Sequence, residues 1–133
     1  MILLPLALIA ATVDASPRAV VEATLAAINR HDAAALARLY ADDAVVIASD
    51  SCKPSIGPEP VRRGHEALIK AMPDLTVEAT DWVVEGDRVA ILFTAHSKAL
   101  GPGGTMTLAD FLTVRNGKIV RDVTIFNPGQ PCR

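Results

Sequence analysis

The stretch that decides the fold runs from Thr105 to Phe126 and reads TMTLADFLTVRNGKIVRDVTIF. It consists of two apolar-rich runs on either side of Asn116-Gly117. An Asn-Gly pair between such runs is a strong hairpin signal, because both central residues of a type I′ turn need a positive φ. The stretch therefore predicts a long antiparallel hairpin that turns at Asn116-Gly117.

An acid interrupts the first strand of this hairpin. Side chains alternate along a strand, so Asp110 shares one face with Leu108, Leu112 and Val114. A lone buried carboxylate is too costly, so Asp110 must be paired, protonated or open to a cavity. Two interpretations stay open: a pocket acid with a raised pKa, or a structural acid bonded to the backbone or to a cross-strand Thr or Arg. The first makes Asp110 the leading candidate for a catalytic residue.

The length and composition predict a single globular domain. The chain has 133 residues, of which 50% are hydrophobic and 21% are charged. The net charge is −2 and no basic run exceeds Arg62-Arg63, so binding to nucleic acid or to an anionic membrane surface has no electrostatic support. No phosphate loop, dinucleotide fingerprint or His pair at ligand spacing occurs, and we therefore predict no cofactor and no metal.

The N-terminal residues 1–15 predict a signal peptide. Residues 2–13 form an apolar block that is too short to span a bilayer, so we expect no stable membrane span. Val13-Asp14-Ala15 offers small residues at the positions that signal peptidase requires, and cleavage would leave Ser16 as the new terminus. This predicts a periplasmic or secreted protein. The segment lacks Lys and Arg before its apolar block, so an apolar extension packed on a cytoplasmic domain is the alternative.

The two cysteines predict one disulfide in the exported protein. Cys52 lies in a Pro/Gly-rich loop and Cys132 next to the C-terminus. An oxidising compartment would allow a bond that pins the tail to that loop.

Residues 16–133 predict one α+β domain. Ser16-Pro17 is typical of a helix start, and Asp32 of the cap of a second helix. A Pro- and Gly-rich loop at 49–64 and two hairpins follow. The expected elements are helices from 17 to about 30, at 33–40 and at 65–72, and strands at 44–48, 75–85, 88–99 and in the two arms of the first hairpin.

Five short motifs carry a resemblance to a known family: Asn29-Arg30-His31-Asp32, Leu39 to Val45 (LYADDAV), Gly64 to Leu68 (GHEAL), Glu85 to Ala90 (EGDRVA) and Val114 to Val120 (VRNGKIV). In this order they resemble the nuclear-transport-factor-2-like (NTF2-like) superfamily, in its branch of polyketide cyclase (SnoaL-like) and ketosteroid isomerase-like proteins. The resemblance implies a cone-shaped, curved antiparallel sheet with about three helices over its concave face, enclosing a pocket. It does not fix an activity, because one fold can host many.

The resemblance also implies roles for individual residues. It places Asp110 where ketosteroid isomerases hold a protonated aspartic acid. The isomerase tyrosine corresponds to Thr24 and the general base to Ala48, so steroid isomerisation by that arrangement is not expected. Asp50 lies two residues on and could substitute as the base, or it could begin an exposed loop.

The cyclase branch implies a pocket His and Asp that transfer a proton next to a carbonyl. The candidates here are His96 and Asp122. His96 could equally be an exposed residue at a strand end, and Asp122 could pair with Arg121 or Arg115 at the surface. We expect His31 and His65 to be structural. The further candidates for ligand contacts are Thr24, Tyr40, Trp82, Phe93, Leu112, Thr124 and Phe126.

These observations predict an NTF2-like protein with a pocket for a small apolar, carbonyl-type molecule. Isomerase, cyclase or lyase chemistry at Asp110 is one interpretation. The alternative is a non-catalytic ligand-binding or dimerising domain with a degenerate active site. A second copy of the chain, bound through the open face of the sheet, is the expected macromolecular partner.

Overall fold

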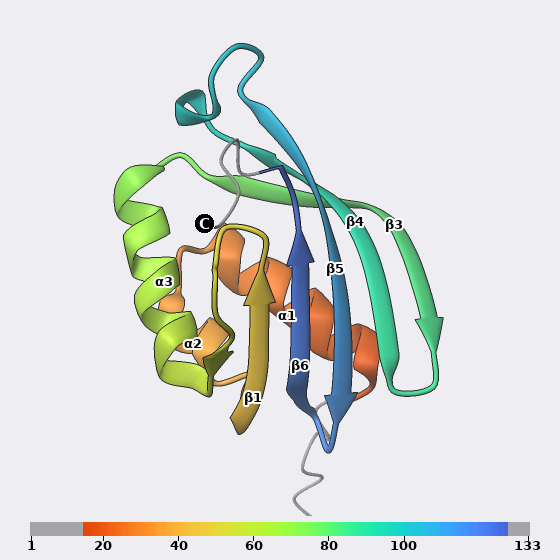
Figure 1. Cartoon of the computed structure of the whole chain (residues 1–133). Helices are drawn as coiled ribbons and strands as arrows, with labels where there is room; N and C mark the ends of the chain where they lie inside the picture. The colour runs from red at the N-terminus through yellow and green to blue at the C-terminus, as the bar shows by residue number, and fades with distance from the viewer. Residues whose placement is uncertain (1–14, 128–133) are drawn as a thin grey trace, which may run out of the picture.

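The structure is a computed structural model that describes residues 15–127, in which six strands form one sheet and helices cover one of its faces. The strand order is β2-β1-β6-β5-β4-β3, and the sheet is strongly curved (Figure 1). The α+β architecture with a covered concave face is confirmed. The signal-peptide prediction falls on residues 1–14, outside the described part of the chain, apart from Ala15.

The central hairpin is confirmed with its turn. Strands β5 (Thr105–Arg115) and β6 (Lys118–Ile125) pair antiparallel. Asn116 and Gly117 have φ values of 51° and 71°, as a type I′ turn requires. The second hairpin, β3 (Thr76–Glu85) and β4 (Arg88–His96), lies beside it, and β4 pairs with β5.

One strand pair differs from the expected antiparallel sheet. Strand β1 (Tyr40–Ala48) runs parallel to β6, with Val46 opposite Asp122 and Ala48 opposite Thr124. Parallel neighbours need a long connection, and here helix α3, the β3–β4 hairpin and strand β5 lie between the two strands in the sequence. The short strand β2 (Ser55–Ile56) completes the sheet beyond β1.

The first helix was predicted correctly and the other two differ. Helix α1 (Pro17–Asn29) starts at the expected Ser16 cap, whose hydroxyl accepts from the Ala19 amide. Helix α2 covers only Ala33–Ala37, and Tyr40, expected in that helix, is the first residue of β1. Pairing with Ile119 of β6 holds Tyr40 in the sheet, so tertiary pairing overrides the helical pattern.

Helix α3 (Pro58–Ala71) begins within the expected loop, seven positions before the predicted start at His65. The prolines at 58 and 60 that suggested a loop occupy the first turn of the helix. Proline is tolerated there, because the amides of the first turn have no partner within the helix. A single turn of 3₁₀ helix, Lys98–Leu100, lies between β4 and β5.

Helix α1 is tied to the edge strand β3. The Asn29 side chain accepts from the Val77 amide (2.7 Å) and donates to the Val77 carbonyl (3.0 Å). His31 Nε2 lies 2.7 Å from the Leu75 carbonyl oxygen. These contacts occupy backbone groups that an edge strand would otherwise expose, and they hold α1 against the concave side of the sheet.

None of the helices among residues 15–127 is long and apolar enough to cross a membrane.

Candidate functional site

A cavity of about 550 Å³ lies between the helices and the concave face of the sheet. The helix wall comes from α1, from α3 and from the residue that follows α3, and it includes Thr24, Ile28, Val61, His65, Leu68 and Met72. The sheet wall includes Val46, Phe93, Leu108, Asp110, Asp122 and Thr124. Most of the lining is apolar, and no Lys or Arg of the described residues belongs to it.

Two acids lie side by side on the sheet wall. Asp110 of β5 faces Thr124 of β6, and Asp122 of β6 faces Leu112 of β5, so the acids are diagonal neighbours on one face of the hairpin. Asp122 is only 5% exposed. Its Oδ2 accepts a hydrogen bond of 2.6 Å from the Tyr40 hydroxyl. The strand alternation thus places both carboxyl groups inside the cavity.

Burial sets the proton affinity of this pair. Burial raises the pKa of Asp110, the charge of Asp122 raises it further, and the Thr124 hydroxyl opposes this. Burial also raises the pKa of Asp122, although less, because the Tyr40 hydroxyl stabilises its carboxylate. The pKa of Tyr40 is itself raised by burial and by Asp122, so the phenol stays protonated and donates. Because the two acids interact, their protons leave in two steps that belong to the pair. Within the pair, Asp110 retains its proton more strongly than Asp122.

A histidine that the sequence analysis took as structural also lines the cavity. His65 is 6% exposed and stands in the middle of α3. Burial lowers the pKa of His65, and His31 lowers it further, so the imidazole is neutral at neutral pH. The helical spacing of Val61, Leu68 and Met72 with His65 could have revealed this position, had the prolines not been interpreted as a loop.

The cavity holds all the buried side-chain polar atoms that lack a hydrogen-bond partner among the described residues. They are His65 Nε2, Asp110 Oδ1 and Asp122 Oδ1. Buried polar atoms are normally paired, and unpaired ones in a native structure call for an explanation. Three such atoms around one cavity indicate a place where a bound molecule completes the hydrogen bonding.

The comparisons with known proteins show the family and the fold of the chain. Residues 21–122 match the SnoaL-like domain family. The chain belongs to the SnoaL-like domain family. No curated protein matches the sequence.

Solved structures share the fold of this SnoaL-like domain. A proposed polyketide cyclase of Sinorhizobium meliloti, protein SMa1630, is 26% identical, with a TM-score of 0.68 over 80% of this chain and 93% of that one. AclR, a proposed hydroxylase of Streptomyces galilaeus, is 27% identical, with a TM-score of 0.70 over 84% and 88%. An NTF2-like protein of unknown function from Cytophaga hutchinsonii is 15% identical, with a TM-score of 0.71 over 89% and 96%. The NTF2-like fold is thus shown, while the described activities differ.

Most of the sequence-predicted site residues lie on the cavity of the SnoaL-like domain. Asp110 and Asp122 lie on its sheet wall, and the exposed Asp50, in the turn after β1, also borders it. His96 ends β4 outside the lining and is partly exposed. Of the expected ligand contacts, Thr24, Tyr40, Phe93, Thr124 and Phe126 line the cavity.

The other two expected contacts do not line it. The ring of Trp82 lies 4.5 Å under the Arg18 guanidinium, and Leu112 is a buried core residue. The Thr24 hydroxyl already donates a hydrogen bond to the Val21 carbonyl (2.7 Å), so its proton is not available to a ligand in the cavity. Within residues 15–127, no group of three or more His, Cys, Asp or Glu is arranged to hold a metal.

The predicted disulfide cannot be checked in the structure. Cys132 lies outside the described residues, so its bond to Cys52 stays a prediction.

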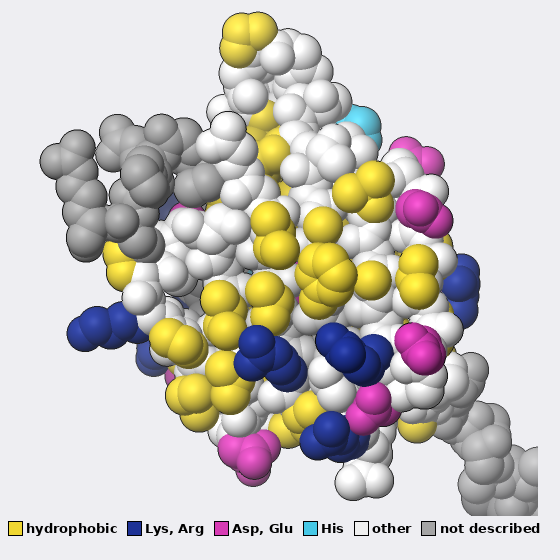
Figure 2. Space-filling view, turned by 45° about the vertical axis from the view of Figure 1, so that its right-hand side comes forward, with side chains coloured by type: hydrophobic (Ala, Val, Ile, Leu, Met, Phe, Trp, Pro, Cys, Tyr) yellow, Lys and Arg dark blue, Asp and Glu magenta, His cyan; other side chains and the backbone are white. Residues whose placement is uncertain are grey.

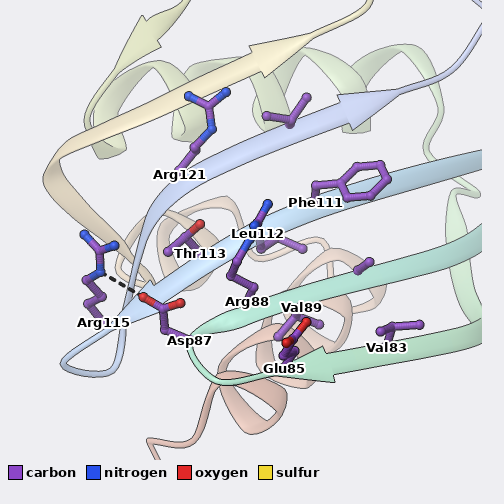
Figure 3. A pocket seen from close by; sticks show the side chains of 12 residues that line it. Val83, Glu85, Asp87, Arg88, Val89, Phe111, Leu112, Thr113, Arg115 and Arg121 are labelled. Carbon is purple, nitrogen blue, oxygen red and sulfur yellow. Dashed lines mark hydrogen bonds and ion pairs between the residues drawn. The ribbon is translucent and has the colours of Figure 1, made fainter.

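The outer face of the sheet carries a second, open hollow of about 590 Å³. Hydrophobic side chains gather in the middle of this face, with basic side chains at one end (Figure 2). Val83, Leu92, Phe111 and Ile125 are between 42% and 61% exposed there. Arg88 and Arg121 stand on either side of Thr113 in the strand register, and Arg115 pairs with Asp87 (Figure 3).

Proposed function

We propose that the cavity binds a small, uncharged, carbonyl-type molecule and that Asp110 and Asp122 move a proton on it. The observation that carries this proposal is the set of unpaired polar atoms, two of which are the Oδ1 atoms of these acids. A ligand hydrogen-bonded to both would relieve the cost of burying them. The description of the S. meliloti relative as a proposed polyketide cyclase supports the same class of reaction.

The two acids have environments suited to different roles. Asp110 holds its proton more strongly, so it donates a hydrogen bond to the carbonyl oxygen of the ligand and stabilises the enolate that forms. Asp122, held by Tyr40 at Oδ2, uses Oδ1 to take the proton from the carbon next to the carbonyl. Returning that proton to another carbon completes an isomerisation, and attack by the enolate on a second carbonyl closes a ring. Pairs of acids whose pKa values are pushed apart are typical of such acid and base assignments.

The lining supports a neutral ligand. No Lys or Arg among the described residues borders the cavity, so a carboxylate or phosphate on the ligand would meet Asp110, Asp122 and, at the edge, Asp50, and no cation. Leu108, Phe93 and Met106 contribute apolar surface to the same wall as the acids. An apolar body with a carbonyl group matches this combination.

Solvent-proton exchange tests the chemistry directly. With 2-tetralone as the probe in D2O, we expect the protein to accelerate deuterium incorporation at the carbon beside the carbonyl. Asp110→Asn and Asp122→Asn should each lower the acceleration by about a hundredfold or more, the range that general acid–base groups contribute. Asp43→Asn, on the exposed part of β1, is the matched control and should leave it unchanged.

Two outcomes would contradict the proposal in different ways. Binding of 2-tetralone without accelerated exchange would favour a non-catalytic binding protein. Accelerated exchange that survives both Asn substitutions would mean that other groups perform the chemistry.

We further propose that the domain dimerises through the outer face of its sheet. The exposed Phe111 and Val83 form part of an apolar surface that a second copy could cover, and the basic end of the face would lie at its rim. Light scattering over a concentration series should give a mass near twice that of the monomer. Phe111→Lys should give the monomeric mass without loss of the folded circular-dichroism spectrum; a monomeric mass for the unmodified chain would reject this part.

Export is also a proposal, supported by the apolar segment before Ser16. Mass spectrometry of the protein recovered from a bacterial periplasm should show Ser16 as the first residue. Recovery of only the full-length chain from the cytoplasm would contradict it.

A further inference from the structure

We propose that His65 is a ligand-binding residue, and that the ligand carries two polar groups: one for the acid pair and a hydroxyl for His65. This inference rests on the pocket function proposed above, because both concern the same cavity. It adds the requirement that the ligand carries a second polar group, which the acid pair alone does not impose.

His65 is a buried histidine with an unpaired ring nitrogen. The imidazole is 6% exposed, and its Nε2 has no hydrogen-bond partner among the described residues. Of its neighbours in the cavity lining, Val61 and Leu68 carry no polar side-chain atom, and Met72, just after α3, offers only the weak acceptor of a thioether. Burying an unpaired polar atom is costly, whereas Leu or Phe would fill the same position without that cost. A hydrogen-bonding partner that arrives with the ligand accounts for a histidine here.

His65 and the acids belong to different walls. Asp110 and Asp122 come from β5 and β6 in the sheet, and His65 comes from helix α3. Apolar lining residues such as Phe93 and Leu108 of the sheet and Val61 of the helix border the space between them. A ligand that satisfies all the unpaired atoms therefore needs an apolar body with a polar group toward each wall.

The protonation state of His65 indicates a hydroxyl at its end of the ligand. The imidazole is neutral, so Nε2 either donates or accepts a hydrogen bond, depending on the tautomer. A hydroxyl serves both cases, because it can donate and accept. An ammonium or a carboxylate would each fit only one tautomer, and neither would receive an opposite charge from a neutral imidazole.

A cycle of ligand and protein changes tests this assignment. The probes are 2-naphthol and 2,6-dihydroxynaphthalene, which share one apolar body and differ by a second hydroxyl at the far end. Isothermal titration calorimetry would measure both with the unmodified protein, His65→Phe, His65→Gln and His96→Phe. The last variant is the matched control, since His96 lies outside the cavity lining.

We expect the second hydroxyl to tighten binding by about tenfold in the unmodified protein and in His96→Phe, the effect of one added hydrogen bond to a buried group. His65→Phe should remove this gain, and His65→Gln should retain part of it, because the amide keeps a polar atom. A ¹⁵N spectrum of the imidazole should shift at Nε2 with the diol. A merely structural role for His65 would weaken both probes equally and leave the gain intact.

The inference fails if the diol binds no better than 2-naphthol, if it does not bind at millimolar concentration, or if the gain persists in His65→Phe. These failures are separate from failure of the proton-transfer proposal. That proposal is tested by the rate of deuterium exchange into 2-tetralone in the unmodified protein, Asp110→Asn and Asp122→Asn. Circular dichroism and thermal unfolding of each variant establish that it is folded before its affinity is compared.

Discussion

The Tyr40 hydroxyl donates a hydrogen bond of 2.6 Å to Oδ2 of Asp122, a residue 82 positions later in the chain. The bond joins the start of β1 to β6 inside the cavity. It occupies one oxygen of the carboxyl group and leaves Oδ1 without a partner. The fold therefore fixes the orientation of Asp122 while its second oxygen stays available to a ligand.

Replacing Tyr40 by Phe should destabilise the protein near neutral pH. The change keeps the ring but leaves Asp122 Oδ2 buried without a donor, which should lower the free energy of unfolding by about 1–3 kcal/mol. Because the hydroxyl lowers the pKa of Asp122, that pKa should rise further in the variant. The loss should therefore be smaller at pH 4, where the carboxyl group is closer to its protonated form. Urea unfolding at pH 7 and pH 4 measures both values, and an equal loss at the two pH values would contradict the account.

Replacing Asp110 by Asn should remove a pH dependence from stability. Burial and the charge of Asp122 raise the pKa of Asp110 in the folded state. A raised folded-state pKa favours folding most below the unfolded value of about 3.9, and this contribution declines as pH rises toward the folded value. Near neutral pH the Asn variant should be as stable as the unmodified protein or slightly more stable.

Urea unfolding between pH 4 and pH 8 checks this sign. The unmodified protein should lose stability relative to Asp110→Asn as the pH rises. Carbon-detected NMR of the Asp110 carboxyl gives the pKa itself. A midpoint at or below about 3.9 would instead support a structural carboxylate held by donors.

Substitutions at two glycines should show whether stability depends on the positive φ of the hairpin turn. Gly117 has φ +71°, and an added Cβ would lie 3.2 Å from the Ala15 Cβ. Gly117→Val should cost about 1–3 kcal/mol, and Gly117→Asn less, because Asn adopts positive φ more readily. Gly64, within helix α3, has nothing within 4 Å of its added Cβ and serves as the control.

Gly64→Ala should be neutral or stabilising by up to about 1 kcal/mol, because alanine is the better helix former. Thermal and chemical unfolding of the three variants would establish the order. Equal stability of Gly117→Val and the unmodified protein would mean that the hairpin does not need positive φ at this turn.

The predicted bond between Cys52 and Cys132 can be tested in solution. Titration of the unreduced, exported protein with a thiol reagent should find no free thiol. Reduction should lower the free energy of unfolding by roughly 3–5 kcal/mol, the model-dependent effect of closing a loop of this length. Two reactive thiols in the unreduced protein would reject the bond.

The local structure could be predicted wherever a few adjacent residues determine it. Asn116-Gly117 fixed the hairpin because its turn requires positive φ, and Ser16-Pro17 fixed the start of α1. Strand alternation around Asp110 predicted which face of β5 is buried. The same local rules failed at Pro58, where prolines typical of a loop begin helix α3. They also failed at Tyr40, which was expected in a helix but pairs with β6 as the first residue of β1.

The candidate site depended on contacts that no local pattern encodes. The sequence by itself determined the two central strands and placed Asp110 among apolar neighbours, because alternation and turn geometry act over a few residues. Only the tertiary structure decided that Asp122 lies beside it with Tyr40 as its donor, and that His65 faces the same cavity. The parallel pairing of β1 with β6 and the packing of α3 over the sheet bring together residues far apart in the chain. Those arrangements come from burying the apolar surface of the whole domain, which is a property of the complete chain and of no single segment of it.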